Sequence, residues 1–161
     1  MLGIRKAITR DTEAQIEQLE RRLESERRKN QEELDLMRKQ LVRISRGVSL
    51  SEEALMRGQL HDDVPSGQLK TFLEGLNEPF VLDVRSAAEV ASGKVPGALN
   101  IPIEQLGGRL SELPTDKSRP VVAYCAMGGR SAAACELLSQ NGYLTLYNGG
   151  GVGSYQGTLE R

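Results

Sequence analysis

The chain has 161 residues, of which 27% are charged, and a formal net charge of −1, which leaves room for one domain and an additional segment. The near-zero net charge excludes a nucleic-acid-binding protein held mainly by bulk electrostatic attraction. One histidine and two cysteines are too few for a four-ligand zinc site within one chain or for a secreted disulfide framework, so a reducing compartment is expected.

The composition changes near His61. Residues 1–60 contain no aromatic residue and no proline, whereas residues 61–161 contain all the aromatic residues, all the prolines and both cysteines. A packed domain needs turn-forming and bulky core residues. The second stretch is therefore the predicted domain.

This division gives three expected segments. They are a coiled-coil helix over residues 1–48, a connector with a short helix over residues 49–64, and a globular domain over residues 65–161. No stretch has the apolar length of a membrane span, and the first residues lack the apolar core of a secretory signal. We therefore expect a cytoplasmic protein without a membrane partner.

A long helix is predicted from Thr12 to about Arg46, because this stretch consists mostly of helix-forming residues and Thr12 with Gln15 fits a capping box. Its apolar residues, spaced three and four apart, form the seam of a coiled coil. The seam has two runs: Ile16, Leu19 and Leu23, then Leu34, Met37, Leu41, Ile44 and Val48. Leu34 follows Leu23 by eleven positions, the spacing of a stutter, and Glu26 and Asn30 occupy the seam positions between them.

So polar a helix has no core of its own, and its seam needs a partner. Self-association into a homodimer is the favoured interpretation. Two alternatives stay open: binding to another protein, or a solvated single helix stabilised by its Glu and Arg pairs.

The connector carries a second, short helix from Ser49 to Arg57, with Ser49 and Glu52 as its capping pair and Gly58 at its end. His61 follows in a polar stretch. We interpret it as a solvated surface histidine.

The domain alternates predicted helices and strands. The strands are 80–84, 98–101, 121–124 and 144–147, and the helices are 69–76, a short one capped by the pair Ser86 and Glu89, 106–113 and 129–140. This alternation predicts an α/β fold in which a small parallel sheet is flanked by helices on both faces. Ligand sites in such folds lie at the carboxyl ends of the strands, and Cys125 directly follows the third strand.

The segment from Cys125 to Ser131 combines a nucleophile, small residues and the start of a helix. Such a curl can point backbone N–H groups inward, and together with the positive helix end it forms an anion site. The positive potential of the backbone N–H groups and the helix end, together with Arg130, is the means by which the sequence can activate Cys125, because no histidine is nearby in the chain.

Four segments together resemble a single rhodanese-like sulfurtransferase domain. They are Leu82–Arg85, Gly93–Pro102, Cys125–Ser131 and Tyr147–Gly151. The resemblance implies that Cys125 carries a persulfide and that Arg130 closes the anion-binding loop. It also implies a substrate-binding set of Ala126, Met127, Gly128, Gly129, Arg130, Ser131, Asp83 and Arg85, and it explains Gly149 to Ser154 as a turn beside the site.

Loop length distinguishes two chemistries within this fold. The six residues from Cys125 to Arg130 resemble the sulfurtransferase form, whereas related phosphatases and arsenate reductases use one residue more. Ala126 stands where many thiosulfate-using members carry arginine, so thiosulfate and a protein or low-molecular-weight persulfide both stay open as donors.

The expected function is transfer of a sulfane sulfur from a small-molecule or protein donor to a thiophilic acceptor. The alternatives are an interaction protein whose domain is weakly active or inactive, and a cysteine-based phosphatase or arsenate reductase. For Asp83 and Arg85 a structural ion pair is the competing interpretation, and Cys135 is expected to be structural. Nothing in the sequence points to a metal, nucleotide or flavin cofactor or to a nucleic-acid partner.

Overall fold

The computed structural model describes residues 2–45, 47 and 50–161. They form two units, Met1–Val42 and Arg43–Arg161. Val48, which completes the predicted seam, lies outside the described residues, as do Arg46 and Ser49. Among the described helices, none is long and apolar enough to cross a membrane.

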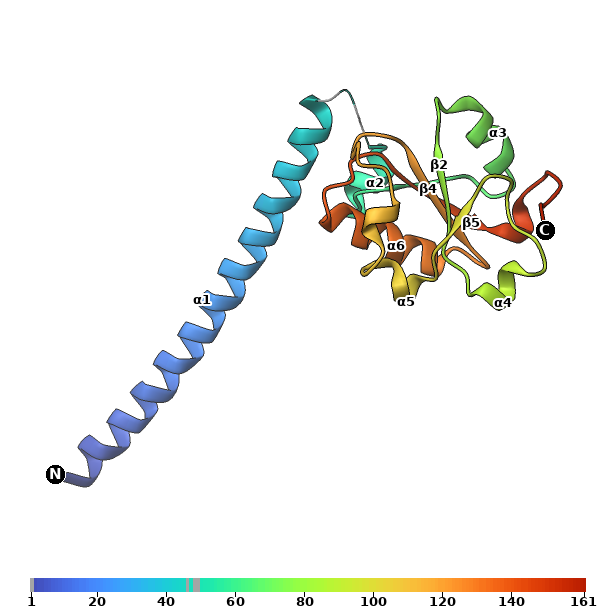
Figure 1. Ribbon diagram of the computed structural model, residues 1–161. Helices are drawn as coiled ribbons and strands as arrows, with labels where there is room; N and C mark the ends of the chain where they lie inside the picture. The colour runs from blue at the N-terminus through green and yellow to red at the C-terminus, as the bar shows by residue number, and fades with distance from the viewer. Residues whose placement is uncertain (1, 46, 48–49) are drawn as a thin grey trace. The chain divides into compact units, whose positions relative to one another are not determined.

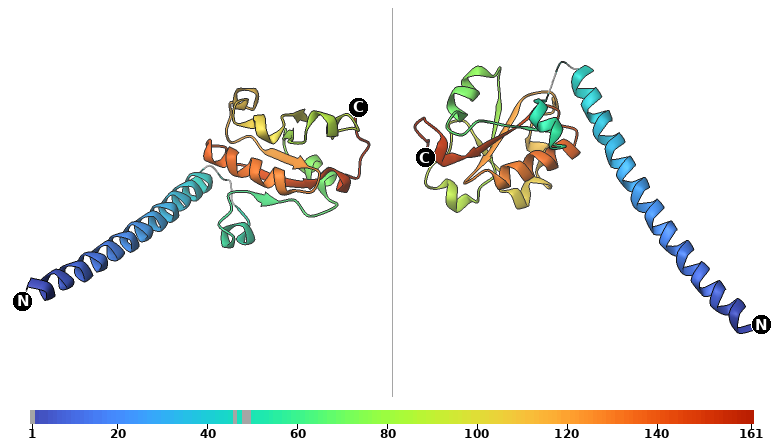
Figure 2. Two further views of the ribbon diagram at one scale, coloured as in Figure 1. Left: turned by 90° about the horizontal axis from the view of Figure 1, so that it is seen from below. Right: turned by 180° about the vertical axis from the view of Figure 1, so that it is seen from behind.

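Helix α1 (Leu2–Ser45) runs uninterrupted for 44 residues (Figures 1 and 2). It begins ten residues before the expected start at Thr12, which therefore lies inside the helix rather than at its cap. The preceding residues contain no proline to stop it. The apolar seam residues within the described helix are all about half to two-thirds exposed: Ile16, Leu19, Leu23, Leu34, Met37, Leu41 and Ile44.

The second unit contains a five-stranded sheet in the order β1-β5-β4-β2-β3, in which every pair is parallel. Its elements are α2 (Glu52–Met56), β1 (Asp62–Asp63), α3 (Leu69–Gly75), β2 (Phe80–Asp83), α4 (Ala87–Val90), β3 (Leu99–Asn100), α5 (Ile103–Leu106), η1 (Leu110–Glu112), β4 (Val121–Cys125), α6 (Gly129–Gln140), β5 (Leu146–Gly151) and η2 (Val152–Ser154). The predicted α/β class, with a parallel sheet, flanking helices and a long N-terminal helix, is confirmed.

Strand β4 separates two hydrophobic cores, because successive side chains of a strand point to opposite faces. Ala123 and Cys125 pack with Ala134 and Leu138 of α6, and Tyr124 packs on the other face with Leu69 of α3. Helices therefore cover both faces of the sheet (Figure 1).

Three segments differ from the expectation. The predicted helix 106–113 is two short pieces, α5 and η1, because the pair Gly107 and Gly108 interrupts it. The strand predicted at 144–147 extends through Gly151, so Gly149 to Gly151 are strand residues rather than a turn. The stretch interpreted as a connector contributes β1, which pairs with β5 at Tyr147 and Asn148.

His61 is buried, with 3% of its surface exposed, and the interpretation as a solvated residue is wrong. The neighbouring strand β1 pairs with β5, which draws His61 into the interior. Among the described residues, neither ring nitrogen has a hydrogen-bond partner, and Nε2 lies 4.0 Å from Oδ1 of Asp63.

Arg43 is the largest fully buried side chain of the second unit, and the sequence patterns did not single it out. Its Nε donates to the Leu144 carbonyl at 2.6 Å, and one Nη donates to the carbonyls of Leu60 and Tyr143. Burial lowers the pKa of Arg43, and the nearby Asp62 and Glu136 charges oppose this effect. The guanidinium thus joins the start of the unit to the turn before β5.

We expect Arg43→Met to lower the free energy of unfolding by about 2–4 kcal/mol, because three buried carbonyls lose their donor. The matched control is Arg38→Met, which removes an exposed ion pair with Asp35 and should change the stability by less than about 0.5 kcal/mol. Urea unfolding followed by tyrosine fluorescence measures the difference, since every tyrosine lies in the second unit. Equal changes in the two variants would contradict the role of Arg43.

Candidate active site

The loop between β4 and α6 surrounds the Cys125 sulfur with donors. Gly128 is the N-cap of α6 and adopts a φ of 104°, a left-handed conformation that suits glycine. This turn directs the Gly128 N–H to Sγ of Cys125 at 3.0 Å. Cys125 itself is 1% exposed, whereas Ala126, Met127 and Gly129 are exposed around it.

These donors decide the protonation state of the thiol. Burial raises the pKa of Cys125, but hydrogen bonds from the Ser131 hydroxyl and from the backbone amides of Met127, Ser131 and Gly128 outweigh burial. The pKa therefore lies below its ordinary value of 9.0. The positive end of α6 acts in the same direction, so the loop favours a thiolate without a neighbouring base.

Ser131 divides its single hydroxyl proton among three acceptors. Its Oγ lies 3.6 Å from Sγ of Cys125, 3.0 Å from the Gly128 carbonyl and 2.6 Å from Oδ1 of Asn148. Because a hydroxyl has one proton to donate, Asn148 competes with the sulfur for it.

The orientation of Asn148 is fixed by two further contacts. Its Nδ2 donates to Oδ1 of Asp63 at 2.8 Å, and its Oδ1 accepts from the Gly150 N–H at 3.2 Å. A flipped amide would lose both contacts. Asp63 in β1 and Asn148 in β5 are therefore indirect neighbours of the nucleophile, and sequence reasoning missed both because the strand pairing that joins them is non-local.

Arg130 does not stand free at the end of the loop. Its two Nη atoms donate to the two carboxylate oxygens of Glu89 at 2.7 and 2.6 Å. Glu89 also completes the capping box with Ser86 at the start of α4. The Arg130 contacts, followed by the Ser86 amide, lower the pKa of Glu89 to about 2, and the pair raises the pKa of Arg130.

The sequence identified Glu89 only as a capping residue. The structure adds that its carboxylate occupies the planar fork with which Arg130 can bind a substrate anion. Glu89 stays ionised across the neutral pH range, because its pKa is about 2. An incoming anion therefore meets an arginine that already holds a carboxylate.

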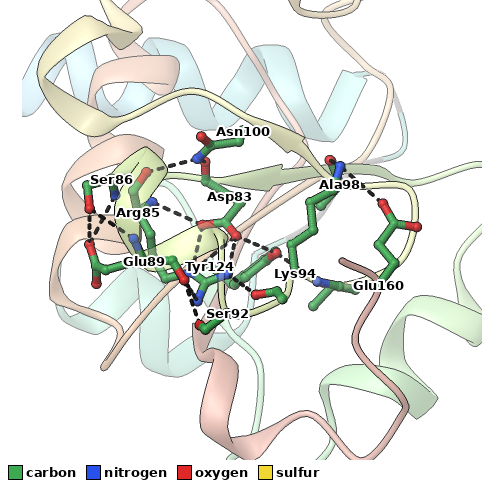
Figure 3. Close-up of polar contacts among 12 residues, drawn as sticks. Asp83, Arg85, Ser86, Glu89, Ser92, Lys94, Ala98, Asn100, Tyr124 and Glu160 are labelled. Carbon is green, nitrogen blue, oxygen red and sulfur yellow. Dashed lines mark hydrogen bonds and ion pairs between the residues drawn. The ribbon is translucent and has the colours of Figure 1, made fainter.

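Asp83 and Arg85, the other predicted site residues, form a buried network rather than part of the loop (Figure 3). Arg85 donates Nη2 to Asp83 at 2.6 Å and to the Gly93 carbonyl at 2.8 Å, and the Tyr124 hydroxyl donates to Asp83 at 2.7 Å. The Tyr124 oxygen in turn accepts from the Val95 N–H. This brace ties β2, β4 and the Gly93 turn together. Arg85 also donates Nη1 to the Glu89 carbonyl at 3.5 Å, and Asn100 donates to the carbonyls of Asp83 and Arg85.

The glycines of β5 let this strand approach the loop. A Cβ at Gly151 would lie 2.5 Å from the Ala126 carbonyl oxygen, a distance that only a backbone shift could relieve. Gly151 is also the strand partner of Cys125. The glycine run at the end of β5 therefore sets the space available to the loop.

Cys135 lies in α6 and is fully buried. Both cysteines are free thiols in the structure. Burial, with smaller contributions from the Asp63 and Glu136 charges, raises the pKa of Cys135. The two thiols thus differ in kind, since only Cys125 has donors that stabilise a thiolate.

The family model of the rhodanese-like domain matches residues 67–155, which include β2 to β5 and the whole loop. The chain belongs to the rhodanese-like family. The pattern found at the sequence level, with Cys125 after the third strand of the domain, is thereby placed in a family of known fold.

Curated relatives support a sulfurtransferase role for this rhodanese-like domain. A sulfurtransferase of Allochromatium vinosum is 38% identical over 54% of this chain and 79% of its own length. A thiosulfate sulfurtransferase of Escherichia coli is 37% identical over 44% of this chain and 68% of its own length. A rhodanese-like domain protein of Staphylococcus aureus has a similar structure, with a TM-score of 0.53 and 28% identity over 62% of this chain and 99% of its own.

We expect Ser131→Ala to raise the pKa of Cys125, because the variant removes a donor to the sulfur. The pH dependence of iodoacetamide alkylation measures this pKa, and Glu89 does not interfere since its charge is constant above about pH 3. The matched control is Ser139→Ala on the same helix, whose hydroxyl bonds only the Glu136 carbonyl and whose loss should leave the profile unchanged.

Asn148→Ala gives the opposite expectation for the same measurement. Without the competing Oδ1 acceptor, the Ser131 proton turns to the sulfur and the pKa of Cys125 falls. A fall with Ser131→Ala, or a rise with Asn148→Ala, would refute this account of the hydroxyl.

Proposed function

We propose that the protein transfers a sulfane sulfur through a persulfide on Cys125. The observation that carries the proposal is the cradle at Cys125, where backbone amides and the start of α6 converge on one sulfur and lower its pKa. A group of donors around a single atom stabilises negative charge on that atom. Both a thiolate and the terminal sulfur of a persulfide carry such a charge.

The chemistry balances in two displacements. The Cys125 thiolate attacks the outer sulfur of the donor, a new S–S bond forms, the donor's own bond to that sulfur breaks, and the leaving group departs with the electron pair. From thiosulfate the leaving group is sulfite, and from a persulfide it is a thiolate. An acceptor nucleophile then attacks the terminal sulfur and the Cys125 thiolate is regenerated. The donors that lower the pKa of Cys125 take the place of a general base in forming the thiolate.

Two features favour this reaction over the phosphatase alternative on the same fold. The loop spans six residues from Cys125 to Arg130, the shorter of the two forms in this fold. In addition, Arg130 is bound by Glu89 through both Nη atoms, which places a fixed negative charge where a dianionic phosphate would need an unopposed cation.

The test is intact-protein mass spectrometry after incubation with thiosulfate or with a low-molecular-weight persulfide. We expect the wild-type chain to gain one sulfur atom that dithiothreitol removes, and Cys125→Ser to gain none. Cys135→Ala is the matched control and should load like the wild type, because Cys135 is buried and has a raised pKa. Sulfur on Cys125→Ser, or no loading of the wild type by either donor, would reject the proposal.

A further prediction concerns the donor. Glu89→Gln should lower the thiosulfate concentration needed for half-maximal loading by at least about threefold, because the guanidinium of Arg130 is released from a carboxylate and can bind the anion. The control is Glu112→Gln, which removes the same charge from an exposed pair with Arg109 and should have no effect. An unchanged requirement in Glu89→Gln would show that Arg130 does not bind the donor.

A further inference from the structure

The exposed seam of α1 has a symmetry that its separate runs do not reveal. Its positions, including the two polar ones, are 16, 19, 23, 26, 30, 34, 37, 41 and 44. The intervals are three, four, three, four, four, three, four and three. This order is the same from either end, and Asn30 is its centre. The stutter between the two runs is what makes the pattern palindromic.

A palindromic seam fits one partner in particular, a second copy of the same helix in the opposite direction. We propose that α1 forms an antiparallel two-stranded coiled coil with α1 of a second chain, with the two-fold axis at Asn30. Ile16 then faces Ile44 of the second copy, Leu19 faces Leu41, and Leu23 faces Met37. All six of these side chains are at least half exposed in the single chain, and each meets an apolar side chain in the pair.

The centre of the seam distinguishes this arrangement from a parallel one. In a parallel pair in register, each Glu26 faces the other Glu26 inside the seam, which places two like charges together. In the antiparallel pair, Glu26 is level with Leu34 of the second copy, and the two carboxylates lie about 12 Å apart along the axis. Asn30 faces Asn30 at the two-fold axis, where two amides can hydrogen-bond to each other and fix the register.

The charges that flank the seam agree with the same register. On one side the flanking positions are Arg22, Lys29, Glu33 and Gln40, and on the other they are Glu20, Arg27, Gln31 and Arg38. Reversal of the partner places Lys29 beside Glu33 of the second copy and Glu20 beside Arg38, each twice by symmetry. Arg22 and Arg27 then face the neutral Gln40 and Gln31. No like charges face each other across either side.

A parallel pair would instead place Arg22 beside Arg27 of the second copy, twice, since the flanking contacts of parallel chains join residues five apart. Of the two arrangements, only the antiparallel one avoids like charges both in the seam and beside it. The seam and its flanking charges therefore fit a second copy of α1 in the antiparallel direction. The inference is independent of sulfur transfer, because all of these residues except Ile44 belong to the first unit, and Cys125 lies in the second.

The experiment is disulfide mapping of the full chain, after sedimentation equilibrium has established whether the wild type is a dimer of twice 17.6 kDa. Single cysteines are introduced by Leu19→Cys and by Leu41→Cys in a Cys125→Ser, Cys135→Ala background, so that they are the only thiols present. Under mild oxidation, a mixture of the two variants should form a disulfide-linked dimer that contains one chain of each, because facing residues bring the sulfurs within bonding reach.

Leu19→Cys alone should not cross-link, whereas Asn30→Cys alone should, since only position 30 faces itself. A strong cross-link of Leu19→Cys with itself would indicate a parallel pair and overturn the proposal. A wild-type chain that sediments as a monomer up to about 100 μM, far above the Kd of a stable dimer, would also overturn it.

Substitutions in the seam supply a second measurement. Leu19→Glu should weaken dimerisation at least about tenfold, because it places a charge against Leu41 of the second copy. The matched control is Gln18→Glu, which adds the same charge one residue away from the seam and should leave the dissociation constant within about twofold. Circular dichroism verifies that both variants keep the helix. Equal weakening of dimerisation in the two variants would refute the role of the seam in the dimer.

Discussion

The position of β4 inside the sheet is the constraint on which the site depends. All five residues of β4 are buried, and the strand is paired on both edges, with β2 and β5. A strand fixed on two faces and two edges has little freedom at its carboxyl end, where Cys125 lies. Since α6 begins only four residues later, the amides of the intervening loop have to turn over the sulfur. The geometry around Cys125 is thus a consequence of core packing and strand pairing.

Buried charges hold this framework together by binding backbone groups. Arg85 joins Asp83 of β2 to the carbonyl of Gly93, and Arg43 bonds three carbonyls near the ends of the unit. A buried guanidinium is costly unless its donors are satisfied, so each of these side chains requires a specific arrangement of distant segments. Each of these side chains therefore joins separate segments of the chain.

The site uses two opposite electrostatic arrangements a few residues apart. Cys125 is surrounded by neutral donors, the Ser131 hydroxyl and three backbone amides, which lower its pKa while the sulfur stays buried. Arg130 is held by the full charge of Glu89, whose pKa of about 2 keeps it ionised. The first arrangement favours a reactive sulfur, and the second moderates the attraction for anions at the loop entrance.

Local sequence determined the elements whose causes lie within a few residues. The capping box of Ser86 and Glu89, the bounds of α6 from Gly129 to Gln140, and the buried strand that leads to Cys125 all depend on neighbours in the chain. The structure has the first two as expected, and β4 extends one residue further to include Cys125. The tertiary structure alone decided the burial of His61, the carbonyl contacts of Arg43 and the pairs of Asn148 with Asp63 and Arg130 with Glu89. These contacts join residues 17 to 101 positions apart. No periodicity or capping pattern encodes such pairs, because they arise only when parallel strands and their crossover helices bring distant segments to one edge of the sheet.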